Sequence, residues 1–212
     1  MSWPPPVTLH GSTVILEPLG PQHAAGLSEA VGDGALWELW FTAIPQPAEM
    51  ATEIERRLAL SRAGSMLPFA VVERAGGAPI GMTTYMNVDA VNRRVEVGST
   101  WYRKRAQRTA VNTECKLLLL THAFETLECI AVEFRTSSYN FESRRAIERI
   151  GAKLDGVLRS HAHHTNGTLR DTYVYSIVSA EWPAVRAHLT ARIASRAFEA
   201  NVLARAYWPK TP

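Results

Sequence analysis

The stretch that decides the fold is Trp101–Leu127, which reads WYRKRAQRTAVNTECKLLLLTHAFETL. The residues that lead into it, Val95–Trp101, carry the β-branched and aromatic side chains typical of a strand. The residues after Thr109 contain neither Gly nor Pro and are rich in Leu, Lys, Ala and Glu, which favours a helix. Thr109 is a suitable N-cap for a helix that begins near Ala110. The stretch therefore predicts a strand that feeds directly into a long helix.

Basic side chains gather at this junction, namely Arg103, Lys104, Arg105 and Arg108. The first turn of a helix leaves backbone N–H groups unpaired and carries a partial positive charge, so it attracts phosphate. The basic side chains add formal charge at the same place. Two interpretations stay open: a phosphate-binding loop, or a solvated basic loop before a core helix.

Two blocks of sequence resemble the GNAT acyltransferase superfamily. Residues 107–112, Gln-Arg-Thr-Ala-Val-Asn, resemble its acyl-CoA pyrophosphate loop, Gln/Arg-x-x-Gly-x-Gly/Ala, and residues 113–124 resemble its RimJ/RimL type. Ala110 and Asn112 stand where glycines are usual, which implies a different fit to phosphate or weaker binding. Residues 138–152 resemble the Asn-x-x-Ser/Ala helix that follows the fifth strand in this superfamily. The two blocks lie about thirty residues apart, the span of a strand–helix–strand–helix unit, and the resemblance covers roughly residues 8–180.

The resemblance implies that the donor is acetyl-CoA, or another acyl-CoA such as succinyl-CoA. It places the cofactor along the strand end, the basic loop and the start of the later helix. The residues are Gly98, Ser99, Thr100, Trp101, Arg103, Arg105, Gln107, Arg108, Thr109, Ala110, Val111, Asn112, Thr113, Asn140, Ser143 and Arg144. Asn140 would contact pantetheine amides, and the alternative is that it only caps its helix.

Acyl transfer to an amine needs a base for the amine, donors for the oxyanion and an acid for the departing thiolate. Family geometry implies that backbone N–H groups near residues 98–100 hold the oxyanion. The position of the usual Tyr acid is Ile147, so Ser143 is the preferred acid; the alternative is a first-turn Ser that hydrogen-bonds helix amides. Glu96 is a possible base or a structural partner of an arginine. His161 and His163 are further possible bases, because imidazole titrates near neutral pH.

The family also implies an acceptor pocket beside Trp37, Trp40 and Phe41, whose alternative role is to close the core edge. The acceptor is a primary amine, either a protein N-terminus or a small molecule. His161, with His163 and His164, raises the question of zinc, but no Cys or carboxylate completes a set at useful spacing, so no metal is expected. The spacing of the tail arginines is typical of the solvent-exposed face of a helix, and we do not expect a nucleic-acid partner.

Composition agrees with a folded protein: 212 residues, 46% of them hydrophobic, with a formal net charge of +3. We expect no signal peptide and no membrane span, because neither an apolar h-region nor an 18-residue apolar run is present. Cys115 and Cys129 are expected to be free buried thiols in a reducing cytoplasm.

The pattern of elements predicts a fold of the α/β (α+β) class, with a mostly antiparallel twisted sheet flanked by helices. The strands at 95–102 and 130–135 should be parallel, and the resemblance implies that they splay apart, a place where Gly98 would suit a bulge. We divide the chain into an extended lead-in (1–12), an acyl-CoA N-acyltransferase domain (13–180) and a helical tail (181–212) that packs on the body or on a second subunit of a homodimer. The alternative to an enzyme is a non-catalytic protein of the same fold that binds a partner or nucleic acid.

Overall fold

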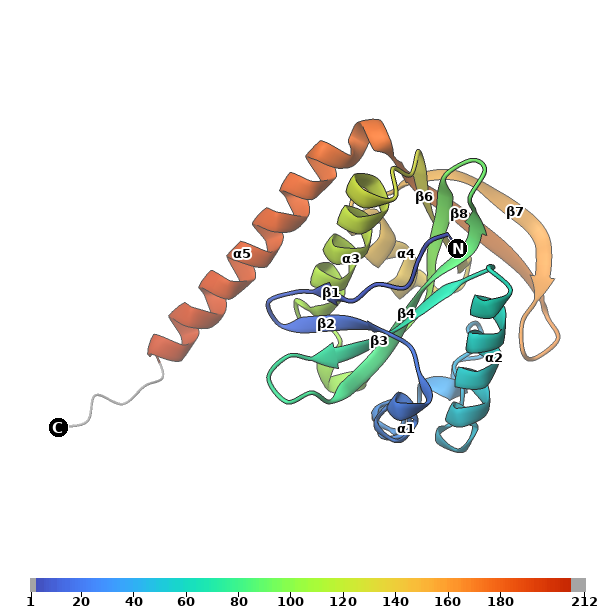
Figure 1. The fold of residues 1–212 in the computed structure, drawn as a ribbon, viewed down its shortest axis with the longest axis horizontal. Coiled ribbons are helices and arrows are strands. Elements are labelled where there is room, and N and C mark those ends of the chain that lie inside the picture. Colours follow the sequence, from blue (N-terminus) through green and yellow to red (C-terminus); the bar gives the residue numbers. More distant parts are fainter. Residues whose placement is uncertain (1–2, 207–212) are drawn as a thin grey trace.

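A computed structural model describes residues 3–206, with side chains described for residues 3–195. Its centre is an eight-stranded sheet in the order β1-β2-β3-β4-β5-β6-β8-β7 (Figure 1). The strands are β1 (Leu9–His10), β2 (Val14–Pro18), β3 (Leu67–Glu73), β4 (Pro79–Asp89), β5 (Arg94–Tyr102), β6 (Ala131–Ser137), β7 (Lys153–His163) and β8 (Leu169–Val178).

Helices cover both faces of this sheet and build two apolar layers. The helices are α1 (Ala24–Gly32), α2 (Met50–Arg62), α3 (Val111–Thr121), α4 (Phe141–Arg149) and α5 (Trp182–Ala206). One layer joins α1 and α2 to β3 and β4 through residues such as Leu27, Ile54 and Met82. The other joins α3, α4 and the start of α5 to the opposite face, through residues such as Leu119, Ile147 and Leu189. The predicted class of fold is confirmed.

β5 and β6 form a parallel pair that soon separates. Their registered pairs are Arg94 with Ala131, Val95 with Val132, and Glu96 with Glu133. β5 continues to Tyr102 and β6 to Ser137 without further pairing between them. We call the point where pairing stops, after Glu96 and Glu133, the fork. The predicted splay of two parallel central strands is therefore confirmed.

A bulge lies in β5 just beyond the fork. Thr84 of β4 stands opposite Gly98, and Met82 stands opposite Trp101, so β5 has two residues where β4 has one. The extra residue is at Ser99 or Thr100, and Ser99 has a φ of 49°. The bulge was predicted at Gly98 and lies one residue later. A Cβ at Gly98 would come within 2.9 Å of Met86 Sδ and 3.0 Å of Glu96 Oε1, so a larger residue there would displace these side chains.

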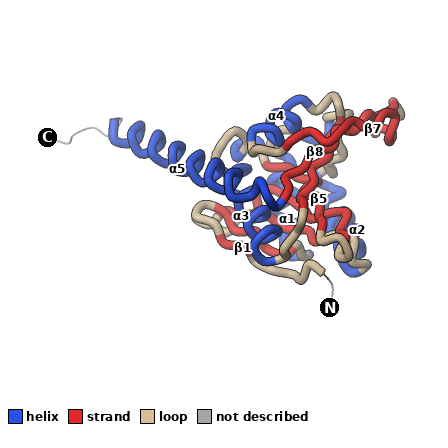
Figure 2. The backbone as a smooth tube through the Cα atoms, turned by 90° about the horizontal axis from the view of Figure 1, so that it is seen from above, coloured by secondary structure: helices blue, strands red, loops and turns tan. Residues whose placement is uncertain are grey.

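The ends of the chain show what periodicity missed. Leu9–His10 of the expected lead-in pairs with β2, so this segment belongs to the sheet. The helix after the basic loop begins at Val111 and continues from His122 to Thr126 as a π-helix. α5 extends away from the body (Figure 2), and the predicted second-subunit contact of the tail, like the domain boundaries, stays a prediction. No helix among residues 3–206 is long and apolar enough to cross a membrane.

Candidate functional site

The start of α3 presents backbone amides beside the fork. Val111 donates its N–H to Thr109 Oγ1 at 3.2 Å, and Thr109 Oγ1 donates to the carbonyl of Ala106 at 2.6 Å. The Thr109 side chain therefore accepts a hydrogen bond from the first residue of the helix, as a capping side chain does, although the residue at the N-cap position is Ala110. The amides of Asn112 and Thr113 donate to no residue within the described part of the chain. Two amides of the first turn are thus available to an anion.

Ala110 fits this loop without backbone strain. Its φ is −71°, in the ordinary right-handed region, and the left-handed residue of the loop is Arg108 with φ 61°. A glycine at 110 is therefore not needed for conformation, and its family role would be close approach only. Asn112 lies in the helix and accepts from Tyr102 OH at 3.2 Å.

The side chains of two arginines and of the glutamine of the loop already have partners within the protein. Arg103 Nε lies 3.3 Å from Asp33 and Arg105 Nη2 lies 2.9 Å from Glu73. The amide of Arg105 and the Arg103 guanidinium lower the pKa of Asp33. Gln107 Nε2 donates to the carbonyl of Tyr102 at 2.9 Å. These side chains hold the loop against α1 and the sheet, so the predicted cofactor contacts of Arg103 and Arg105 would compete with existing ion pairs.

The loop between β6 and α4 brings the second predicted block to the fork. Asn140 Oδ1 accepts the N–H of Ser143 at 3.1 Å, so Asn140 caps α4, as its alternative role required. The Ser143 hydroxyl is half-buried and takes part in no hydrogen bond among the described residues. Arg144 stacks over the ring of Tyr173 at 3.9 Å and donates to the carbonyl of Ser138 at 3.3 Å. Ser143 thus remains available for a reacting group.

Glu96 is buried on β5 at the fork, with 6% of its surface exposed. Asn87 Nδ2 donates to its carboxylate at 2.6 Å, and Arg135 Nε lies 3.5 Å away. Burial raises the pKa of Glu96, although the Asn87 hydrogen bond and Arg135 oppose the shift. A carboxylate with a raised pKa is a better base for an ammonium than an exposed one. The ion pair with Arg135 also fits the structural alternative.

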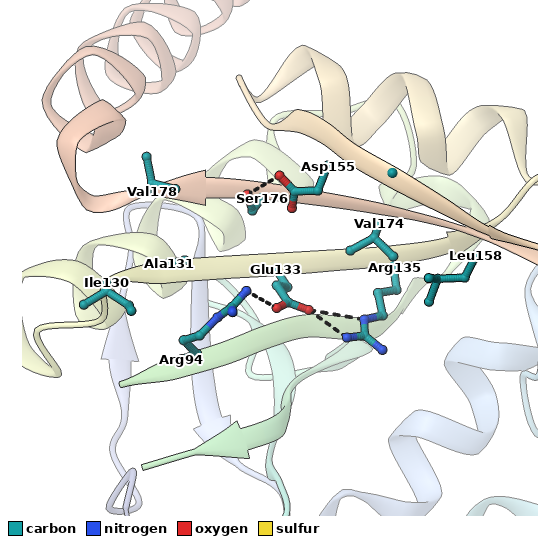
Figure 3. A pocket seen from close by; sticks show the side chains of 11 residues that line it. Arg94, Ile130, Ala131, Glu133, Arg135, Asp155, Leu158, Val174, Ser176 and Val178 are labelled. Carbon is teal, nitrogen blue, oxygen red and sulfur yellow. Dashed lines mark hydrogen bonds and ion pairs between the residues drawn. The ribbon is translucent and has the colours of Figure 1, made fainter. Parts of the chain in front are cut away.

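A hollow of about 580 Å³ lies against β6, β7 and β8, with Arg94, Glu133 and Arg135 in its lining (Figure 3). Glu133 bridges Arg94 and Arg135 in its wall, and Arg135 also reaches Glu96. Ile130, Leu158, Val174 and Val178 supply apolar walls. The hollow is therefore amphipathic, and the ion pair of Arg135 with Glu96 links its wall to the buried carboxylate.

The structure separates the predicted histidines. His161 and His163 are exposed on β7, and His161 Nδ1 lies 3.2 Å from Thr172 Oγ1. His164, weighed only as a metal ligand, is 7% exposed, and its Nε2 lies 2.9 Å from Ser137 Oγ at the end of β6. Two register shifts in β7 break the regular alternation that sequence reasoning assumed. Among the described residues no group of three His, Cys, Asp or Glu residues is arranged for a metal.

The predicted acceptor aromatics fall into two groups. Trp40 packs against the ring of His164 at 4.8 Å, Tyr139 at 5.1 Å and Phe41 at 5.7 Å. Trp37 instead packs on the α1–α2 layer, which matches its alternative role at the core edge. Trp40 and Phe41 therefore lie near the end of β6, whereas Trp37 does not face this cluster.

Sequence reasoning passed over Lys116, a lysine buried in α3 whose Nζ donates to Thr100 Oγ1 at 3.0 Å. The signal that could have identified it is its place in the sequence, because Lys116 directly precedes four consecutive leucines in a predicted core helix. Trp101, another predicted cofactor residue, is buried, and its indole N–H has no partner in the described part of the chain. Both cysteines are free and buried, as expected.

Comparison with known proteins agrees with this geometry. Residues 13–153 match the family described as the acetyltransferase (GNAT) domain. A Bacillus subtilis (strain 168) protein, YdaF, whose name proposes ribosomal N-acetylation, is 35% identical over 106 residues. That alignment covers 50% of this chain and 57% of YdaF, so the chain spans little more than half the length of this curated relative.

Solved structures share the fold. A GCN5-related N-acetyltransferase from Brucella melitensis superposes with a TM-score of 0.80 at 30% identity, covering 89% of this chain and 86% of that one. RimJ of Mycobacterium smegmatis, solved in complex with CoA-disulfide, has a TM-score of 0.74 at 24% identity, over 92% and 96% of the two chains. The resemblance to the superfamily is confirmed. The chain belongs to the GNAT acetyltransferase family.

Proposed function

We propose that this protein transfers an acyl group from an acyl-CoA, acetyl-CoA by default, to a primary amine by direct attack in a ternary complex. The observation that carries the proposal is the fork. It combines diverging parallel strands, a bulge at Ser99 and open amides at the start of α3 on one side with the buried Glu96 on the other. A bound acyl-CoA supplies an activated thioester.

Different residues along the fork bind the phosphate, stabilise the oxyanion and donate to the departing group. The amides of Asn112 and Thr113 bind a phosphate at the helix start. The backbone of residues 98–100 leaves the regular β4 register at the bulge, and its N–H groups are the proposed oxyanion donors. Asn140 and the Ser143 hydroxyl lie on the α4 side, where Ser143 can donate to the departing group.

Glu96 is the proposed base. It takes a proton from the acceptor ammonium that arrives through the hollow of β6 and β8, so the neutral amine can attack. Because burial raises its pKa, Glu96 releases this proton to water near neutral pH more slowly than an exposed Glu, but takes it up more readily. His161 and His163 are second choices, since both are exposed on β7.

The acceptor class is a protein N-terminus or a small amine, and the name of YdaF, which proposes a ribosomal N-acetyltransferase, supports the former. An open hollow with both charged and apolar walls admits an extended peptide better than a closed cavity would. We place the reaction in the cytoplasm, where the two free thiols would stay reduced. The homodimer remains a prediction.

Two measurements test the proposal. Acetyl-CoA at about a hundred times its dissociation constant should raise the free energy of unfolding by about 2.7 kcal/mol, seen as a higher melting temperature. Purified protein with several acyl-CoAs and pooled peptides and metabolites should yield an acylated amine by mass spectrometry. No thermal shift with millimolar acetyl-CoA would favour the non-catalytic alternative and end the proposal.

A further inference from the structure

Lys116 is a buried cation without a counter-ion. Only 6% of its surface is exposed, and its Nζ donates to Thr100 Oγ1 at 3.0 Å. An ammonium has three hydrogens to donate. Within the described part of the chain no carboxylate lies at ion-pair distance from it. Because burying an unpaired charge is costly, the site is built for a partner that carries negative charge.

Helix geometry shows which way Lys116 faces. Glu114, two residues earlier, accepts hydrogen bonds from Ser12 and Thr13 at the turn before β2. Two residues along an α-helix turn the side chain by about 200°, so Lys116 lies on the opposite flank of α3. That flank faces β5, which borders β6 in the sheet. Lys116 therefore reaches the β5 bulge at the edge of the fork.

The groups around Lys116 are neutral or engaged elsewhere. Thr100 Oγ1 also lies 2.8 Å from Thr83 Oγ1. Burial raises the pKa of the Cys115 thiol to about 12. It also raises the pKa of the Tyr102 and Tyr85 hydroxyls well above the usual value for tyrosine. All three groups are therefore uncharged near neutral pH. Burial lowers the pKa of His122, which is therefore neutral as well. The Glu114 carboxylate is held at the far flank.

We propose that Lys116 meets the sulfur of the acyl donor, stabilises it as a thiolate and protonates it as the thioester breaks. The inference rests on the proposed function. The amine nitrogen bonds to the thioester carbon, the C–S bond breaks, and an Nζ proton passes to the sulfur. The nitrogen, which gave one proton to Glu96 before attack, loses a second proton to solvent as the amide forms. Lys116 regains a proton from solvent and Glu96 returns its own proton there, so one proton is released per turnover.

The acidities of the two partners fit. Burial lowers the pKa of Lys116 to about 8, and an ordinary thiol has a pKa of about 8.5. Proton transfer between groups of similar pKa is efficient in both directions. Ile147 has no proton to give, and a serine hydroxyl such as Ser143 is a far weaker acid than an ammonium. Lys116 is thus better suited than either to protonate the leaving sulfur.

The test uses CoA itself as the probe and needs no acceptor. The ultraviolet absorbance of the CoA thiolate is followed against pH with saturating protein, and the same titration with desulfo-CoA corrects for Cys115, Cys129 and the tyrosines. A nearby cation should lower the pKa of the bound thiol by about one unit or more relative to free CoA. Lys116→Met should remove this shift and Lys116→Arg should keep it. Lys153→Met, which removes an exposed lysine on β7, is the matched control.

Each outcome decides. A bound thiol that titrates as in free CoA overturns the inference, and so does a lowered pKa that survives in Lys116→Met. If Lys116→Met does not fold, the wild-type titration and Lys116→Arg carry the decision. In turnover, Lys116→Met should lower kcat by about 100-fold with a less than threefold change in CoA affinity. Failure of wild-type protein to bind CoA would refute the proposed function itself, whereas CoA binding with an unshifted thiol refutes only this inference.

Discussion

The two sides of the fork are built differently. At the start of α3 two of the loop arginines are already paired inside the protein, Arg103 with Asp33 and Arg105 with Glu73, and backbone amides of the first turn are free donors. At the base of β5, one buried side chain, Glu96, lies in a setting that raises its pKa. Under the proposed function, anion binding therefore depends on main-chain geometry, and proton transfer depends on a single carboxylate.

This difference sets the size of mutational effects. Most substitutions leave the backbone N–H groups in place, so changes at the start of α3 should alter the affinity for acyl-CoA only moderately. The neighbouring carboxylate, Glu133, already bridges Arg94 and Arg135, and His161 and His163 are exposed on β7, so the loss of Glu96 should be hard to replace. The contrast would be wrong if side-chain changes at the helix start proved more damaging than a change at Glu96.

The largest effect is expected for Glu96→Gln, which should lower kcat by about 100-fold or more, because a general base contributes about 10²–10⁴. Affinity for acetyl-CoA, measured by calorimetry, should hardly change. Glu55→Gln, on the exposed face of α2, is the control. A less than fivefold loss of kcat in Glu96→Gln would move the base elsewhere and assign Glu96 to its ion pair with Arg135.

The same variant has an opposite effect on stability. A carboxyl whose pKa is raised by folding holds its proton more tightly in the folded state, so its charged form lowers stability at neutral pH. Stability from this group is present at low pH and is lost as pH rises through the raised pKa. Glu96→Gln should therefore melt no lower than wild type at pH 7. A lower melting temperature would show that the Asn87 and Arg135 contacts outweigh the burial of charge.

Asn112→Asp should have the next largest effect, on affinity alone. It places a negative charge of the same shape among the amides that receive phosphate, and should weaken CoA binding about tenfold. An acid near a helix N-terminus stabilises the helix, so the melting temperature without ligand should stay level or rise. Dephospho-CoA, which keeps the diphosphate, should lose affinity equally. Unchanged affinity would place the diphosphate away from the start of α3.

Ser143→Ala should produce a smaller loss. A single neutral hydrogen bond is worth about 0.5–1.5 kcal/mol, which is roughly two- to tenfold in kcat. The helix cap formed by Asn140 uses the backbone N–H of Ser143, so α4 should remain intact. Ser143→Thr, which keeps the hydroxyl, should recover part of the rate. An equal loss in both variants would point to packing.

Much of the fold was predictable because its signals are local. The Gly76–Gly77 and Asn166–Gly167 turns lie at the expected hairpins, and Gly77 and Gly167 have positive φ of 67° and 81°. The two motif blocks located α3 and α4 beside the fork. The short β1 was missed because two paired residues leave no periodic pattern.

The site was less predictable because its partners are distant in sequence. Nothing near Arg103 announces Asp33, 70 residues away, so the loop arginines looked free for phosphate. Alternation along β7 could not reveal its two register shifts, nor that His164 just beyond the strand is buried while His161 and His163 are exposed. The sequence around Lys116 is equally compatible with a surface lysine, and only its burial and its hydrogen bond to Thr100 distinguish it. Burial and long-range pairing are decided by the tertiary fold, which local patterns do not encode.

Ala110 offers the finest test of main-chain binding. Its ordinary φ means that Ala110→Gly relieves no strain, and the variant only removes a methyl group beside the helix amides. Closer approach of phosphate should tighten CoA binding by about two- to threefold, the worth of a slightly better hydrogen bond. Ala110→Val should weaken binding by a similar factor, because a larger side chain keeps the anion away from the amides. Affinities measured by calorimetry should therefore fall in the order Gly, Ala, Val. A flat series would mean that the anion is held by the loop arginines after all, and the two sides of the fork would then both work through side chains.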